Sequence, residues 1–202
     1  MFARELDSRR FGPTFVLIIL NSVVYAATAL ASLNPLVIDG RILAEVGQWN
    51  TRVLFYGWYW QLLTSLFVHA NLLHILGNMF FLLIYGVRAE ELFRIWQYLT
   101  VYFVSGLAGN LLSLLMGPDV VSVGASGAIF GVFGASVIYM RRSVGQSIAG
   151  ALMYSFYLFI LNVGVGVNLL AHFGGLVAGL LMGYLLAQSR RHTYTVRYTV
   201  SW

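Results

Sequence analysis

The sequence contains no cysteine and no lysine, and only 9% of its 202 residues are charged. Without cysteine, neither a disulfide nor a thiolate metal site can form, which leaves four histidines and seven acidic residues as candidate ligands. About a quarter of the residues in a soluble domain are charged, and a disordered chain lacks the 59% of hydrophobic residues found here. The composition therefore indicates an all-α integral membrane protein with lipid around its helices.

Long stretches without Asp, Glu, Lys or Arg locate the expected membrane spans. A bilayer crossing needs about 20 apolar residues, and the longest uncharged stretch, residues 143–189, divides into two spans at Gly164-Val165-Gly166. We therefore expect a single membrane domain over residues 1–202. It has six spans at about 13–33, 68–87, 95–116, 122–140, 148–164 and 167–187, a long structured outer loop at 34–61 and a short cytoplasmic tail at 190–202.

The arginines predict the orientation, because Arg-rich short loops stay on the cytoplasmic side. With six spans, ten of the twelve arginines fall on the side that holds both termini, and only Arg41 and Arg52 fall in the first outer loop. We therefore expect cytoplasmic N and C termini, with His69 and Asn71 at the outer interface. The arginines form small clusters rather than one basic stripe, which argues against a nucleic-acid partner. The first apolar stretch is expected to be a span and not a signal peptide.

Four polar side chains stand out, because polar groups are costly at membrane depth and are functional hypotheses by default. His74 and Asn78 are four residues apart and project from one face of the second span. Ser126 lies near the N-terminus of the fourth span, where unpaired N–H groups and the helix dipole stabilise an oxyanion. His172 is the only ionisable side chain of residues 143–189. Each of the four, taken alone, also has a structural explanation as a packing or hydrogen-bonding group.

Glycine spacing favours close packing of the fourth and sixth spans. Small residues every four positions let helix backbones approach, and the two spans carry such glycines (Gly127, Gly131 and Gly134; Gly175, Gly179 and Gly183). Their contact would bring Ser126 and His172 within hydrogen-bonding distance, which is the pairing that nucleophilic catalysis needs. Since neither span contains an acidic residue, the prediction is a Ser-His dyad without a carboxylate. His74, Asn78 and the backbone N–H of Ser126 are the candidate oxyanion donors.

Together these motifs resemble the rhomboid family of intramembrane serine proteases over about residues 11–190. The motifs are His74-x-x-x-Asn78, Gly124-Ala125-Ser126-Gly127 and Ala171-His172-x-x-Gly175-x-x-x-Gly179. The resemblance implies the minimal six-helix rhomboid bundle, with Ser126 as nucleophile, His172 as general base, and His74 and Asn78 as oxyanion stabilisers. It also implies supporting roles for Gly124, Gly127, Gly175 and Phe130, whose ring would stack on His172. Trp60-Gln61 stands where many relatives have Trp-Arg, so we expect the anchoring of the first outer loop to differ.

The resemblance also implies partners and location. The family cuts transmembrane segments of other proteins within the lipid bilayer, without a cofactor or a metal. We expect a prokaryotic plasma membrane, with the site opening to the extracytoplasmic side through a polar cavity. Substrate is expected to reach the site between the second and fifth spans, with the aromatic-rich fifth span at 148–164 as a gate.

Two other functions stay open at this point. A catalytically inactive relative would bind membrane proteins through the same fold, but it would need neither a nucleophile nor a base, and both are present here. A small transporter would hold its substrate at midplane polar groups between two repeated halves, and the sequence contains no such repeat. The sequence therefore favours the protease over both alternatives.

Overall fold

The computed structural model describes residues 12–143, 147–150, 153 and 167–189, and these are mostly helical. The long helices are α1 (Pro13–Ala31), α5 (Leu72–Leu92), α6 (Ile95–Ser113), α7 (Ser126–Ser143) and α9 (Leu169–Ser189). A single 3-10 turn at Leu114–Met116 continues α6. Among the described residues, four helices are long and apolar enough to cross a membrane, namely α1, α5, the extended α6 and α9.

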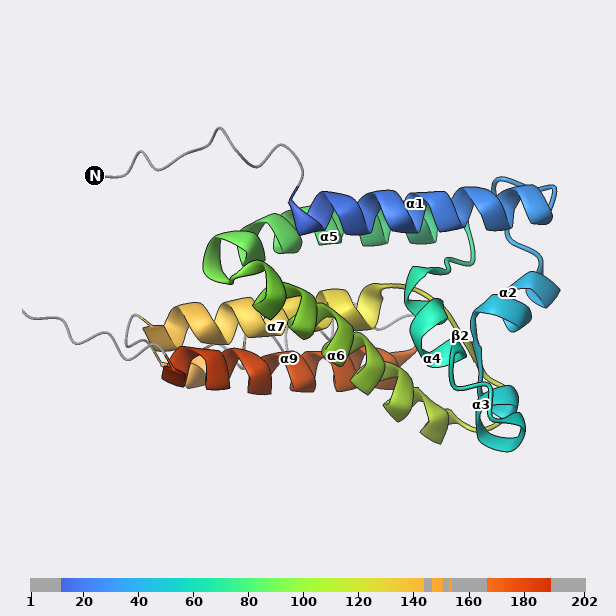
Figure 1. Ribbon diagram of the computed structural model, residues 1–202. Coiled ribbons are helices and arrows are strands. Elements are labelled where there is room, and N and C mark those ends of the chain that lie inside the picture. Colours follow the sequence, from blue (N-terminus) through green and yellow to red (C-terminus); the bar gives the residue numbers. More distant parts are fainter. Residues whose placement is uncertain (1–11, 144–146, 151–152, 154–166, 190–202) are drawn as a thin grey trace, which may run out of the picture.

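Helix α7 lies at the centre of the bundle and packs against α5, α6 and α9. In Figure 1, α7 and α9 lie side by side, α6 crosses them, and α1 lies against α5. Ala128, Val132 and Ala135 of α7 share one buried cluster with Tyr98 and Tyr102 of α6. A helix that is apolar on most sides belongs in the core of a bundle, and α7 is accordingly buried over most of its length.

Local chemistry decides where the helices begin. Helix α5 begins at Leu72 and not near residue 68, because Asn71 caps it: the Oδ1 atom accepts a hydrogen bond from the His74 N–H at 2.8 Å. Helix α7 begins at Ser126 and not near 122, because strand β2 (Val121–Ser122) pairs with strand β1 (Gln48–Trp49). The expected span at 148–164 lies almost wholly outside the described residues, and the tail at 190–202 lies outside them entirely.

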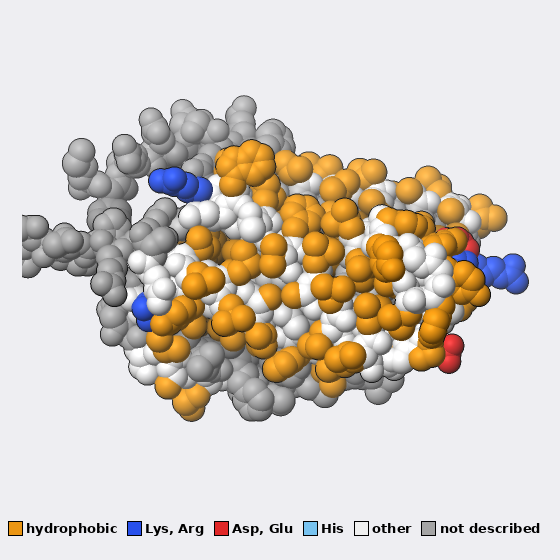
Figure 2. All heavy atoms as spheres, turned by 60° about the horizontal axis from the view of Figure 1, so that its bottom comes forward, with side chains coloured by type: hydrophobic (Ala, Val, Ile, Leu, Met, Phe, Trp, Pro, Cys, Tyr) orange, Lys and Arg blue, Asp and Glu red, His pale blue; other side chains and the backbone are white. Residues whose placement is uncertain are grey.

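The surface of the described part is that of a multi-pass membrane protein. Figure 2 shows hydrophobic side chains over the middle of one face, with charged side chains toward its ends. Apolar residues on the outer sides of the helices are strongly exposed, among them Leu73 at 81%, Leu181 at 60% and Val23 at 59%. Such belts are stable where lipid replaces water.

The loop between α1 and α5 is folded and gathers at one end of the bundle, which we call the loop end (Figure 1). It contains α2 (Gly40–Val46), β1, α3 (Asn50–Tyr56) and α4 (Gln61–Thr64). Two of the described arginines belong to this loop, Arg41 and Arg52. The others lie near the opposite ends of the helices: Arg88 in α5, Arg141 and Arg142 in the last turn of α7, and Arg94 directly before α6.

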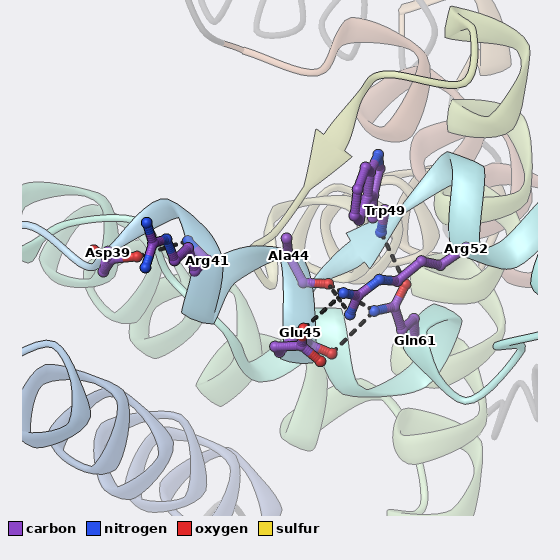
Figure 3. A network of polar contacts seen from close by, with 7 residues as sticks. All are labelled: Asp39, Arg41, Ala44, Glu45, Trp49, Arg52 and Gln61. Atoms are coloured by element: carbon purple, nitrogen blue, oxygen red, sulfur yellow. Dashed lines mark hydrogen bonds and ion pairs between the residues drawn. The ribbon is translucent and has the colours of Figure 1, made fainter.

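Gln61 anchors this loop through neutral contacts (Figure 3). Its fully buried side chain accepts a hydrogen bond from the Trp49 N–H at 3.0 Å and donates to the carbonyls of Ala44 and Glu45 at 2.9 and 3.0 Å. The positive charge in this part of the loop belongs to Arg52. Its guanidinium carbon lies 5.0 Å from the Trp49 ring centroid, and its Nη2 atom lies 2.6 Å from Oε1 of Glu45. The hydrogen bond from Arg52 lowers the pKa of the Glu45 carboxyl.

Candidate active site

Ser126 is the first residue of α7 and follows a tight connection from β2. Within that connection Gly124 has φ 120°, a value that glycine adopts without strain, and its N–H donates to the Ser65 carbonyl at 2.9 Å. A Cβ atom at Gly124 would lie 2.8 Å from His74 Nε2 and 3.8 Å from Ser126 Oγ. A side chain at Gly124 would therefore collide with the His74 ring, and it would also adopt a strained backbone conformation.

Direct backbone contact aligns the beginnings of α7 and α9. A Cβ atom at Gly175 would lie 2.0 Å from the Gly127 carbonyl oxygen, and one at Gly179 would lie 2.0 Å from that of Gly131. No side chain fits between the helices at these points, which is the close approach that the glycine spacing predicts. The first turn of α9 consequently lies beside the first turn of α7.

Ser126 and His172 meet across this contact. The Oγ atom of Ser126 lies 2.6 Å from Nε2 of His172, a hydrogen-bonding distance. The Phe130 ring lies against the imidazole, with 4.7 Å between ring centroids and 33° between ring planes. Among the described residues, His172 Nδ1 has no hydrogen-bond partner. The imidazole is thus held by the serine hydroxyl and the phenyl ring, with no carboxylate behind it.

His74 and Asn78 face the same space from α5. His74 Nδ1 lies 3.5 Å from the Ala70 N–H, which donates to it, so a neutral ring carries its proton on Nε2, the atom that borders Gly124. The Asn78 amide donates one N–H to the His74 carbonyl at 2.9 Å and retains a second. Both side chains can therefore present an N–H group near Ser126.

One cavity of about 810 Å³ joins these groups. Its wall includes polar residues at the loop end and aromatic residues farther along α5 and α7; the site residues that line it are His74, Asn78, Gly124, Ser126, Gly127, Phe130 and His172, and Phe81, Tyr85 and Phe133 extend it. In the described parts of the chain, no three His, Asp or Glu side chains come close enough to share a metal ion. The cavity therefore places the Ser126 hydroxyl, the imidazoles of His74 and His172 and the Asn78 amide next to an apolar wall.

His69 lies just before α5, at the loop end, and its expected position at the outer interface stays a prediction. Its side chain is fully buried, and its ring packs edge-on against His74 with 5.0 Å between centroids. Burial, with a smaller contribution from His74, lowers the pKa of His69 to about 3. Asn71 is partly buried and caps α5.

This burial predicts a pH dependence of stability. An unfolded histidine binds a proton below about pH 6.5, whereas folded His69 stays neutral down to about pH 3, so acid favours the unfolded chain between those values. We expect the fall in Tm between pH 7 and pH 4.5, measured in detergent, to be smaller in His69→Phe by about 4 °C or more.

Glu45→Gln is the matched control for this experiment. Its carboxyl is exposed in the outer loop, where the hydrogen bond from Arg52 lowers its pKa, so its removal should change the fall in Tm much less than His69→Phe does. An equal fall in Tm for His69→Phe and the unaltered protein would contradict the expectation.

Comparison with known sequences decides the family. Residues 56–189 match the Rhomboid domain, which is more than half of the chain. The chain belongs to the rhomboid family. The matched region of this rhomboid runs from the end of α3 to the end of α9 and contains every candidate site residue.

Curated relatives of this rhomboid include proteins of a plant, a protozoan and a bacterium, Bacillus subtilis. It is 34% identical over 160 residues to RHOMBOID-like protein 5 of Arabidopsis thaliana, covering 75% of this chain and 52% of the relative. It is 35% identical to RHOMBOID-like protein 6, mitochondrial, of the same plant, covering 63% and 43%. It is 35% identical to Rhomboid-like protease 3 of Toxoplasma gondii, covering 61% and 50%. The chain spans about half the length of these three relatives.

Sequence reasoning missed Asn168, which lines the cavity of this rhomboid. The signal was an Asn directly before the apolar stretch of the sixth span, a common arrangement for a helix N-cap. Its other partners lie on distant segments, Ser113 and Ser122, and no sequence pattern pointed to them.

Proposed function

We propose that this rhomboid is a serine endopeptidase that hydrolyses a peptide bond in or near a transmembrane segment of other membrane proteins. The observation that carries the proposal is the 2.6 Å contact between Ser126 Oγ and His172 Nε2 inside a cavity that His74 and Asn78 also line. The printed name of the Toxoplasma relative, a protease, supports the same activity. No metal or cofactor takes part in the proposed reaction.

Acylation begins with the Ser126 hydroxyl, which donates its proton to His172 Nε2 as Oγ attacks the scissile carbonyl carbon. For this transfer Nε2 must be unprotonated, so the neutral imidazole carries its proton on Nδ1. The tetrahedral intermediate collapses, its C–N bond breaks, and Nε2 returns the proton to the leaving amine. An ester then joins Ser126 to the N-terminal product.

Water completes the reaction by the reverse sequence. It gives a proton to His172 Nε2 and its oxygen attacks the ester carbonyl, after which Ser126 Oγ leaves and recovers the proton. The polar loop end of the cavity supplies a path for this water, because Asn110, Ser122 and Asn168 line it there.

Three N–H groups are placed to stabilise the oxyanion in both steps. They are Nε2–H of His74, the free N–H of Asn78, and the backbone N–H of Ser126 at the start of α7, where the helix dipole adds to the stabilisation. Gly124 keeps a side chain away from His74 Nε2, and Gly127 and Gly175 let α9 approach α7.

Removal of His74 is expected to act on the chemical step. We expect His74→Ala to lower kcat by about 10²- to 10³-fold with KM changed less than about 3-fold, because an oxyanion donor acts in the transition state. Ser136→Ala is the control, since in the described part of the chain the Ser136 hydroxyl bonds within α7, to the Val132 carbonyl. A raised KM at unchanged kcat would assign His74 to substrate binding instead.

We also propose the orientation and location. Most of the described arginines lie at the end of the bundle opposite the loop end, and the positive-inside rule then places that end in the cytoplasm with both termini of a six-span chain. The cavity opens on the extracytoplasmic side of a cell membrane. The substrate class is a single-span protein whose transmembrane segment unwinds near that side.

Two measurements test the proposed function directly. The purified protein in liposomes should cleave a single-span test substrate and should react with a fluorophosphonate, whose phosphorus bonds to Ser126 Oγ as fluoride leaves. Ser126→Ala should do neither. A folded protein that neither cleaves the substrate nor accepts the probe would indicate the inactive, binding-only relative.

A further inference from the structure

Asn168 caps the helix that carries His172. It immediately precedes α9, its Oδ1 atom accepts a hydrogen bond from the Ala171 N–H at 2.9 Å, and its carbonyl accepts one from the His172 N–H at 3.1 Å. Asparagine is among the best residues for this position, because its side chain satisfies an N–H that the helix leaves unpaired. The first turn of α9 is thus fixed at its own end.

The same side chain reaches two other segments. Its Nδ2 atom lies 2.5 Å from the Ser113 hydroxyl at the end of α6 and 2.9 Å from the Ser122 hydroxyl in β2. Both hydroxyls are buried, at 0% and 5% exposure. Both N–H groups of the Asn168 amide are therefore engaged, and one of them holds the strand that leads into Ser126.

These contacts extend to the outer loop. The Ser113 carbonyl accepts a hydrogen bond from the Asn50 side chain at 2.9 Å, and Asn50 in turn accepts one from Gln48 at 2.9 Å. Gln48 pairs with Ser122 in the two-stranded sheet. The polar contacts thus form a ring from Asn168 through α6 and the outer loop back to β2.

We propose that Asn168 is a positioning residue that holds the His172 imidazole against Ser126 by tying the start of α9 to β2 and α6. The inference rests on the proposed function. A serine protease usually orients its histidine with a carboxylate on Nδ1, and in the described part of this chain Nδ1 has no partner. The position of the ring then depends on the backbone that carries it, and Asn168 fixes that backbone relative to Ser126.

Asn168→Ser separates the two roles of the side chain. Serine keeps an oxygen that caps the helix, but it is too short to reach both hydroxyls and has no amide. We expect kcat to fall about 10- to 100-fold, because small displacements of reacting groups are this costly, with KM within about 3-fold of the unaltered protein. The rate of fluorophosphonate labelling, which needs no substrate, should fall by the same factor.

Two further variants make the result specific. Ser122→Ala removes one partner, and its effect on kcat should not add to that of Asn168→Ser, since both break the same tie. Ser136→Ala removes an equally buried hydroxyl that, among the described residues, bonds to the Val132 carbonyl of its own helix, and this variant should leave kcat unchanged. The proposal would be overturned if the losses of kcat in Asn168→Ser and Ser122→Ala added in the double variant. It would also be overturned if Ser136→Ala lost as much kcat as Asn168→Ser for the same change in Tm.

A spectroscopic measurement separates this proposal from the proposed function. The ¹⁵N resonance of His172 Nε2 reports its hydrogen bond to Ser126 whether or not the protein cleaves anything. If the unaltered protein is inactive, the proposed function fails, and a changed Nε2 resonance in Asn168→Ser still supports the positioning role. An unchanged resonance in Asn168→Ser overturns it.

Discussion

Replacing His172 with alanine is expected to lower kcat for a transmembrane substrate by about 10⁴-fold or more, with little change in KM. The hydroxyl of Ser126 is a weak nucleophile at neutral pH, and its only neighbour within hydrogen-bonding distance that can accept the proton is Nε2 at 2.6 Å in the described structure. Without the imidazole, both the attack and the protonation of the leaving amine lose their catalyst.

The double variant Ser126→Ala/His172→Ala sharpens this expectation. Members of a nucleophile and base pair act as a unit, so the double variant should be no slower than Ser126→Ala alone. The comparison is made in liposomes with one substrate and with Tm measured for each variant. Losses that multiply in the double variant would mean that the two residues act separately.

Gly179→Ala is the second change with a large expected effect. The new Cβ atom would lie 2.0 Å from the Gly131 carbonyl oxygen and 2.5 Å from its Cα, both of them backbone atoms that cannot rotate away. To reach van der Waals distance, α9 must move by more than about 1 Å, which separates His172 from Ser126 and costs about 10²-fold or more in kcat. Overpacking of this kind also destabilises a fold by about 1–3 kcal/mol.

Two variants on the same pair of helices serve as comparisons. Gly134→Ala meets the Leu176 side chain at 2.9 Å, which can rotate, before it meets backbone, so its effect on kcat should be smaller. Leu181→Phe adds volume on the exposed side of α9, where the residue is 60% exposed, and should leave kcat unchanged. If Gly179→Ala kept its activity, the helix contact would not set the geometry of the dyad.

Those features of the site that depend on residue spacing within one helix could be predicted from the sequence. The glycine spacing predicts the contact of α7 with α9, and that contact brings Ser126 to His172. The resemblance predicts that Phe130 stacks on His172; the two rings are in contact, but they are tilted by 33°. Counting apolar residues located four of the spans to within a few residues, because length and hydropathy are set by the bilayer.

Long-range pairing limited the rest of the prediction. The uncharged stretch 120–140 predicts a helix from about residue 122, but pairing with Gln48 and Trp49 makes Val121 and Ser122 a strand. The residues that flank His69 in the sequence do not show that its ring is buried against His74. The start of α5 at Leu72 can be predicted from the sequence, because Asn71 is a recognisable helix cap.

The glycine stripes leave the relative height of α7 and α9 undetermined. Gly175 contacts Gly127 and Gly179 contacts Gly131, so a slip of one helical turn would again place glycine on glycine, with Gly179 at Gly127. That slip of four residues would carry His172 about 6 Å away from Ser126. The glycine spacing alone therefore does not distinguish the two registers, and under the proposal above the hydrogen bonds from Asn168 to β2 and α6 select the one in which His172 meets Ser126.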